Sequence, residues 1–293
     1  MTPIAPSSPP ARVYQRGVRP MHIAGRALVY ALLIVGAFVF LLPFFWMLST
    51  SLKAKNLVSE VPIVWIPPKL MWENYILPWQ YMPFGIWYRN TIFITAVNVV
   101  GIVLASSLVA FGFARINFWG RNVHFIILLA TMMLPAQVTL IPTYLIWSKL
   151  GAINTFWPLI VPQWLSTGYD VFLLRQFFQT IPREMDEAAR MDGCGWFGIY
   201  RLIALPLAKP ALGVLAITNF AWNWNNFFDP LIYLNSTEKF TVSLGLTLFQ
   251  GRMAREIPGL MAMTMVSMIP VLITFFIAQR YFIQGIVISG VKG

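Results

Sequence analysis

The chain has 293 residues, of which 58% are hydrophobic and 11% are charged, whereas soluble domains contain roughly 45–50% and 25%. This composition excludes an ordinary soluble domain and predicts an all-α membrane protein with several spans. The single cysteine, Cys194, cannot form an intrachain disulfide, and the net charge of +11 forms no continuous basic stripe. We therefore expect no metal site, no catalytic residues and no nucleic-acid partner.

Six apolar runs of about 20 residues predict six transmembrane helices. They cover residues 27–50, 86–114, 123–144, 156–178, 207–231 and 260–278. The first run is too long for a signal peptide and is interpreted as a retained helix. With an inside N-terminus most of the 21 Lys and Arg residues fall on the inner side, so we expect cytoplasmic N- and C-termini. The predicted organisation is an N-terminal tail (1–24), a transmembrane domain (25–281) and a C-terminal tail (282–293).

Two of the predicted loops and spans carry unusual residues. The outer loop 51–85 is rich in proline and contains Trp65, Trp72 and Trp79, which is typical of an interfacial aromatic segment. In the third span, Pro135 and Pro142 predict a kink.

Asp170 lies inside the fourth predicted span, where a carboxylate is costly. Three roles stay open from the residues alone: a polar substrate contact, a proton relay, or a pairing with a partner subunit. The neighbouring Gly168 permits close packing of another helix.

The inner loop 180–206 contains the stretch IPREMDEAARMDGCGWFGIYRLIALP, which begins at Ile181 and has the pattern of a short helix. Pro182 suits the first helical position, the carboxylates that follow suit the first turns, and Gly193 suits a left-handed stop. One predicted face consists largely of small side chains and comprises Met185, Ala188, Ala189 and Asp192.

The fifth span contains the stretch ITNFAWNWNNFFDP, in which four asparagines lie where lipid is expected. Helical spacing places Asn219, Trp222, Asn223 and Asn226 on one face and leaves Asn225 off it as a packing residue. An amide facing lipid is unsatisfied, so this face should point into the protein or a wet cavity. Amides and an indole suit a sugar, but interhelical amide bonds would explain the same pattern.

The loop resembles a known signature. Glu187, Ala188, Ala189, Gly193, Ile203, Leu205 and Pro206 match at full spacing the EAA motif of permease subunits of ATP-binding-cassette (ABC) importers. LPLAKPAL, FTVSLGLTLFQG and QRYFIQGIVISGVKG are similar to the smaller permease of the maltose-type, carbohydrate-uptake branch. The resemblance covers residue 27 to the C-terminus.

This resemblance implies a type I importer permease architecture, with six transmembrane helices and a cytoplasmic coupling helix. It implies that Glu187 contacts an ATPase subunit, that Ala188 and Ala189 give close packing, and that Gly193 turns the chain back to the membrane. The full set expected to couple to the ATPase is Glu187, Ala188, Ala189, Asp192, Gly193 and Pro206. The segment 217–230 also resembles the sugar-lining helix of the larger maltose permease. This chain departs from that helix at Trp222, where the larger permease has a phenylalanine.

The chain contains no GxxxxGK[ST] phosphate-binding loop. The resemblance therefore implies that ATP and Mg²⁺ are bound by a separate ATPase dimer, beside a second homologous permease and an extracytoplasmic solute-binding protein in a prokaryotic cytoplasmic membrane. The expected substrate is a sugar. The alternatives are a phosphorylated or glycerol-phosphate solute and, in another class, an ion-coupled secondary transporter. An anionic solute should recruit Arg or Lys to mid-membrane, and the spans show none away from their ends, which favours a neutral sugar.

Overall fold

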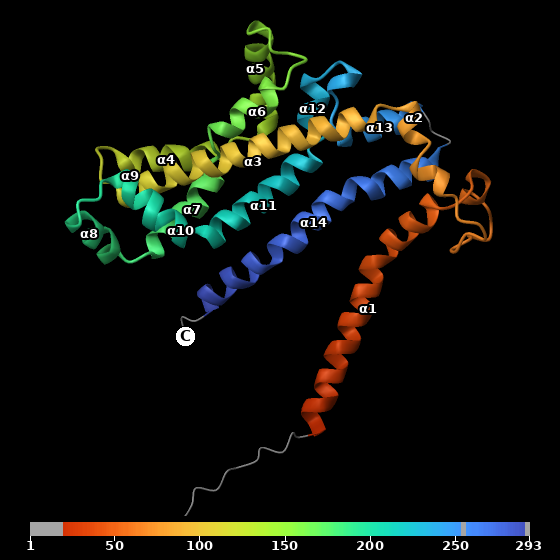
Figure 1. Cartoon of the computed structure of the whole chain (residues 1–293), viewed down its shortest axis with the longest axis horizontal. Helices are drawn as coiled ribbons and strands as arrows, with labels where there is room; N and C mark the ends of the chain where they lie inside the picture. The colour runs from red at the N-terminus through yellow and green to blue at the C-terminus, as the bar shows by residue number, and fades with distance from the viewer. Residues whose placement is uncertain (1–19, 253–255, 291–293) are drawn as a thin grey trace, which may run out of the picture. The chain divides into compact units, whose positions relative to one another are not determined.

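The computed structural model describes residues 20–252 and 256–290, and these residues form helices and loops with no strand (Figure 1). The described elements are α1 (Pro20–Ser51), η1 (Lys55–Val58), η2 (Trp72–Tyr75), α2 (Pro78–Tyr81), α3 (Phe84–Arg115), α4 (Arg121–Thr131), α5 (Ala136–Lys149), α6 (Trp157–Trp164), α7 (Gly168–Thr180), α8 (Arg183–Met191), α9 (Trp196–Ile199), the π-helical turn η3 (Tyr200–Ala204), α10 (Leu205–Leu207), α11 (Lys209–Asn225), α12 (Phe228–Tyr233), η4 (Thr237–Lys239), α13 (Val242–Arg252) and α14 (Ile257–Gly290). Residues 1–19 and 291–293 of the predicted tails lie outside the described part, and α14 continues nine residues past the predicted end of the membrane domain at 281.

Helix α1 belongs, up to Met47, to a separate compact unit and is considered by itself. Its apolar side chains from Leu28 to Phe45 are exposed on all sides. A helix that is apolar all round suits a membrane span. Its length and composition match the first predicted span.

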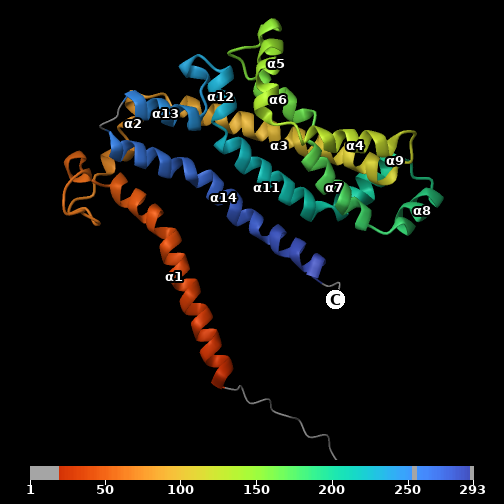
Figure 2. The same cartoon turned by 180° about the vertical axis from the view of Figure 1, so that it is seen from behind.

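The unit that begins at Leu48 is organised around α3. Helices α7, α11 and α6 pack against α3, and α14 packs against α11. In both views α11 and α14 lie on one side of α3, whereas α6 rises from the other side (Figures 1 and 2). The largest buried cluster joins Phe111 of α3, Phe178 of α7, Ala189 of α8 and Tyr200 of η3. A second cluster, around Trp87 near the other end of α3, joins that helix to α13 and α14. Helix α3 thus contributes to buried packing along its whole length.

Three of the six predicted spans are confirmed as single helices. Helix α3, the first helix Gly25–Ser51 and the segment Ile257–Ile277 of α14 are long and apolar enough to cross a membrane. The third predicted span is a pair, α4 and α5, bent by 96° at a break that includes Pro135. Pro135 therefore breaks the helix as predicted, whereas Pro142 lies inside α5.

The other two predicted spans are not single helices. The fourth is divided at residues 165–167, where Ser166 has a φ of 61° and Thr167 caps α7. For the fifth, α11 begins at Lys209 after a 76° bend and ends at Asn225, so α12 is separate from it. By length and composition the described residues provide up to five spans, and the count of six stays a prediction. Hydropathy indicates that a run of residues is apolar, but it does not indicate where the helix backbone breaks within that run.

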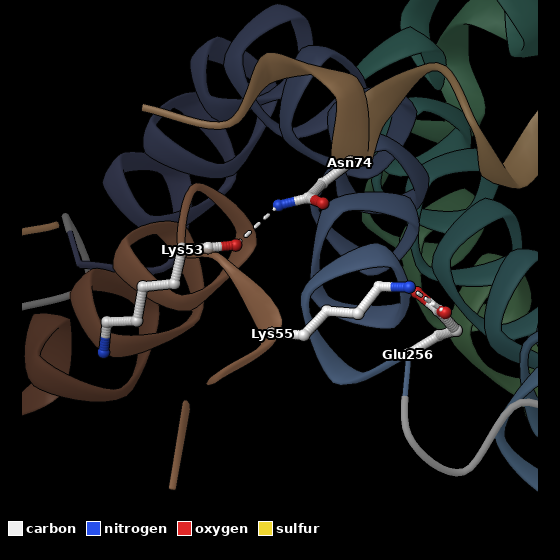
Figure 3. Close-up of polar contacts among 4 residues, drawn as sticks. All are labelled: Lys53, Lys55, Asn74 and Glu256. Carbon is white, nitrogen blue, oxygen red and sulfur yellow. Dashed lines mark hydrogen bonds and ion pairs between the residues drawn. The ribbon is translucent and has the colours of Figure 1, made fainter. Parts of the chain in front are cut away.

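The predicted outer loop 51–85 contains the short helices η1, η2 and α2, and hydrogen bonds hold its segments together. The Asn74 Nδ2 donates to the Ser51 and Lys53 carbonyl oxygens, at 2.9 Å each, and the Ser51 and Tyr75 hydroxyls are 2.7 Å apart. The Lys55 ammonium forms an ion pair with Glu256, directly before α14 (Figure 3). Trp65, Trp72 and Trp79 are exposed, as an interfacial segment requires.

Candidate functional site

Helix α8 forms where the loop pattern predicts it, with Pro182 as the N-cap rather than the first helical residue. The predicted face of small side chains is split by the fold. Ala189 is buried against the main cluster, whereas Met185, Ala188 and Asp192 are exposed. The buried face consists instead of Asp186 and Ala189, because residues three apart lie on one side of a helix.

The opposite face of α8 is open. Glu187 and Ala188 are exposed there, and Met191 is exposed at the end of the helix. Among the described residues, α8 is a short helix that packs against the protein on one face and is exposed on the other. Such an arrangement is able to present a carboxylate and a small side chain to another protein.

The turn after α8 depends on Gly193. Its φ of 84° is the left-handed conformation that glycine adopts without strain, which confirms the predicted stop. The Gly193 amide donates to the Arg190 carbonyl at 3.0 Å, and the Cys194 amide donates to the Ala189 carbonyl at 2.9 Å. Cys194 is half-buried and packs against the main cluster.

An ion pair that the sequence does not predict holds the buried face of α8. The Arg115 Nε lies 3.3 Å from the Asp186 Oδ2, and the Arg115 Nη2 donates to the Ile181 carbonyl at 2.6 Å. The side chains of Arg115 and Asp186 are only 3% and 10% exposed. In the sequence Arg115 is one of the inner-side basic residues that set topology, and no local signal links it to an acid so far along the chain.

The chain returns from α8 through a second short helical run. Segment Trp196–Leu207 includes η3, where the Tyr200 hydroxyl lies 2.8 Å from the Ser107 hydroxyl of α3. Pro206 lies within α10 and is exposed. The structure places Pro206 in the bent segment after α8, and its coupling role stays a prediction.

The asparagine face of α11 is divided between two environments. Asn223 is buried, and its Oδ1 accepts a 2.6 Å hydrogen bond from the Asn98 Nδ2 of α3. The Asn219 Nδ2 donates to the Asp170 Oδ1 of α7 at 3.2 Å. These two amides join neighbouring helices within the chain, as the interhelical alternative requires.

Asp170 is buried at the start of α7. Its Oδ2 accepts a 2.7 Å hydrogen bond from the Thr167 hydroxyl, which in turn accepts the Asp170 amide at 3.2 Å. This reciprocal pair caps the helix, and the carboxylate lies at the positive end of the helix dipole. The adjacent Gly168 approaches α4 so closely that a Cβ there would lie 2.8 Å from the Leu128 carbonyl oxygen, which confirms the predicted close packing.

The remaining residues of the predicted face line a surface groove of about 540 Å³ where α11 ends and α12 begins. Trp222, which is 71% exposed, and Asn226 contribute to it together with Asn225. Asn225 is exposed in this chain, and its interpretation as a packing residue stays a prediction. The Asn226 side chain also bonds to the first turn of α12, because it accepts the Asp229 amide at 3.2 Å and donates to the Asp229 carboxylate at 2.8 Å. The groove offers an indole face and two amides.

No group of three metal-ligating side chains occurs in the part of the chain that the structure describes. The groove lining contains no Arg or Lys.

Comparisons with known proteins agree with these features. Residues 98–288 match the family described as "Binding-protein-dependent transport system inner membrane component". The arabinooligosaccharides transport system permease protein AraQ of Halalkalibacterium halodurans is 32% identical over 262 residues, which are 88% of this chain and 93% of the relative.

Two solved structures share the fold. One is a chain of a bacterial ABC transporter involved in the import of the acidic polysaccharide alginate, with a TM-score of 0.78 and 26% identity, covering 91% of this chain and 99% of that one. The other, from an alginate ABC transporter in complex with an alginate pentasaccharide-bound periplasmic protein, has a TM-score of 0.65 and 17% identity, with coverages of 89% and 96%. The second supports the fold alone.

Proposed function

Because the chain belongs to the family of binding-protein-dependent transport system inner membrane components, we propose that it is one of two membrane permeases of an ABC importer for a neutral sugar. Membership of this family makes the chain a membrane transport component rather than an enzyme. It also removes the ion-coupled secondary transporter from the alternatives. The observation that carries the coupling part of the proposal is the open face of α8.

In this proposal α8 is the coupling helix. Glu187 and Ala188 are exposed next to the Gly193 turn, where an ATPase subunit can contact them. Ala189 supports the helix from inside, and Asp192 and Pro206 flank the contact. ATP and Mg²⁺ belong to an ATPase dimer, and both termini of this chain are cytoplasmic. The complex further contains a second homologous permease and an extracytoplasmic solute-binding protein, the kind of periplasmic partner found with the second solved relative.

The proposed substrate contact is the groove at the end of α11. Trp222 presents a flat apolar surface that suits the C–H face of a sugar, and Asn225 and Asn226 offer amide groups for hydroxyls. Asn219 and Asn223 support this surface rather than line it, because their amides form hydrogen bonds with α7 and α3. A groove lined without Arg or Lys favours a neutral sugar over a phosphorylated or acidic one.

The test is uptake by the complete complex in proteoliposomes. The chain is co-expressed with the second permease, ATPase and solute-binding protein of the same organism, and a panel of labelled neutral oligosaccharides is compared with alginate oligosaccharides and a hexose phosphate. We expect ATP-dependent uptake of a neutral sugar. Uptake driven by a proton gradient without ATP would overturn the proposed function, and uptake of only the anionic compounds would overturn the proposed substrate class.

Two variants separate coupling from binding. Glu187→Lys should leave the protein in the membrane but uncouple ATP hydrolysis from uptake. Trp222→Ala should raise the KM for the sugar about tenfold, a loss of about 1.4 kcal/mol. Trp119→Ala is the matched control, because Trp119 is also exposed but lies in the loop before α4. An unchanged KM in Trp222→Ala would remove the groove from the substrate path.

A further inference from the structure

The buried Arg115–Asp186 pair connects the two parts of the molecule that an importer must move together. We propose that this pair is the positioning contact that fixes the coupling helix α8 to the long helix α3, so that a displacement of α8 moves α3. The proposal rests on the proposed function, because it assumes that an ATPase moves α8.

The geometry makes this a two-point attachment. One guanidinium reaches the Asp186 carboxylate of α8 through Nε, at 3.3 Å, and the Ile181 carbonyl between α7 and α8 through Nη2, at 2.6 Å. The contact with Ile181 is a hydrogen bond and the contact with Asp186 is an ion pair, so the planar guanidinium holds this region through two of its nitrogens. A rotation of α8 relative to α3 therefore breaks the hydrogen bond to Ile181 or separates the ion pair with Asp186.

Burial makes the attachment stiff. Both side chains are almost fully removed from solvent, and the pair adjoins a cluster that contains Ala114, Phe178 and Ala189. A buried charge cannot leave its partner without losing its compensation. The two charges also suit their helices, since Arg115 is the last residue of α3 and Asp186 lies in the first turn of α8.

The N-terminal part of α3 is also held by hydrogen bonds, in this case to the residues just before and at the start of α13. The 32 residues of α3 span about 48 Å at 1.5 Å per residue. Near its start, the Trp87 Nε1 donates to the Thr237 carbonyl at 2.8 Å, and the Thr91 hydroxyl accepts the Val242 amide at 2.8 Å. Between the ends, Asn98 bonds to Asn223 of α11, the helix that ends at the groove. One rigid helix thus links α8, the groove helix and the segment before α13.

The other charged contact of α8 stays local, because the Arg190 guanidinium lies 5.1 Å from the ring of Trp196 in α9. The chain itself enters through the exposed Pro182 and leaves through the glycine turn at Gly193, and neither makes a charged contact. Of the ion pairs found among the described residues, Arg115–Asp186 is the one that reaches α8. The pair is therefore the strongest polar contact through which motion of α8 reaches α3.

The experiment measures ATP hydrolysis by the complete complex in nanodiscs, with and without its sugar-loaded solute-binding protein. The stimulation of hydrolysis by the binding protein reports communication between the two faces of the membrane. We expect Asp186→Asn to lower this stimulation roughly tenfold, within the range known for residues that carry coupling. Asp186→Glu should restore most of it, because the charge returns.

The matched control is Glu184→Gln, which removes an exposed carboxylate from the first turn of the same helix. Its stimulation should equal that of the wild type. Recovery of the ATPase with the permease on purification shows that each variant complex has assembled. Arg115→Lys serves as the milder variant if Asp186→Asn does not assemble, because lysine keeps the charge but lacks the fork that holds two acceptors.

Full stimulation in Asp186→Asn, or in Arg115→Lys where that variant replaces it, would overturn the inference. An equal loss in Glu184→Gln would also overturn it, since the effect would then belong to the charge of α8 in general. A wild-type complex that shows no stimulation would instead overturn the proposed function. The two failures are therefore distinguishable in one set of measurements.

Discussion

Two ion pairs join a loop region to a long helix in this protein, and their surroundings differ. Arg115 and Asp186 join α8 to α3 with side chains 3% and 10% exposed, whereas Lys55 and Glu256 join η1 to the start of α14 with side chains 58% and 31% exposed. The same chemistry has different consequences in the two places. A buried pair is costly to break, while water and salt screen an exposed pair.

The largest effect is expected from Arg115→Ala. The substitution leaves the Asp186 carboxylate buried without its positive partner and the Ile181 carbonyl without its donor, which should cost roughly 3–5 kcal/mol. Thermal unfolding of the complex in detergent measures the loss. The double variant Arg115→Leu and Asp186→Leu should recover much of the stability because it removes both charges. A small loss in Arg115→Ala would mean that the two pairs are equivalent after all.

A smaller loss of stability is expected from a change in the backbone turn at the end of α8, which leaves the charges in place. Gly193→Ala places a side chain at a φ of 84°, which should cost about 1–2 kcal/mol. Gly195→Ala is the control, because its φ is −76° and no atom lies within 4 Å of a Cβ at either position. Equal melting temperatures for the two variants would show that the left-handed turn does not hold α8 in place.

An effect of intermediate size is expected from a neutral contact between two helices. Asn98 and Asn223 are both buried and share a 2.6 Å hydrogen bond. A double-mutant cycle with alanine at both positions should give a coupling energy of roughly 0.6–1.7 kcal/mol, as found for interhelical bonds in membranes. A coupling energy near zero would mean that burial alone does not strengthen a polar contact in this fold.

The smallest effect is expected from Lys55→Ala. An exposed pair contributes about 0–1 kcal/mol, and the contribution should shrink further as salt is added. Melting temperatures at low and high ionic strength test this. A large loss that persists in high salt would show that the exposed pair is as important as the buried one.

The sequence predicts best those features whose signal is local. The long apolar runs became α1, α3 and α14, and the helix α8 with its turn at Gly193 follows from charge placement and one glycine. The break before α7 had a local signal as well, because Thr167 followed three positions later by Asp170 is a capping pattern. The apolar character of the surrounding run concealed it.

The missed features depend on tertiary contacts. Nothing near Arg115 in the sequence indicates that its partner is Asp186, so its charge could be read only as topology. Helical spacing put Asn219, Trp222, Asn223 and Asn226 on one face, but the end of α11 at Asn225 moves Asn226 into the next turn. Which amide bonds to a helix and which lines the groove follows from where α3 and α7 lie.

The position of Cys194 gives the molecule a built-in reporter. It is the single cysteine in the sequence, it is half-buried beside the Gly193 turn, and its amide closes the end of α8. A thiol-reactive dye should therefore label this sequence at one position, at a rate that depends on how exposed the thiol is. Comparing that rate with and without nucleotide would follow α8, the proposed coupling helix, with no residue changed.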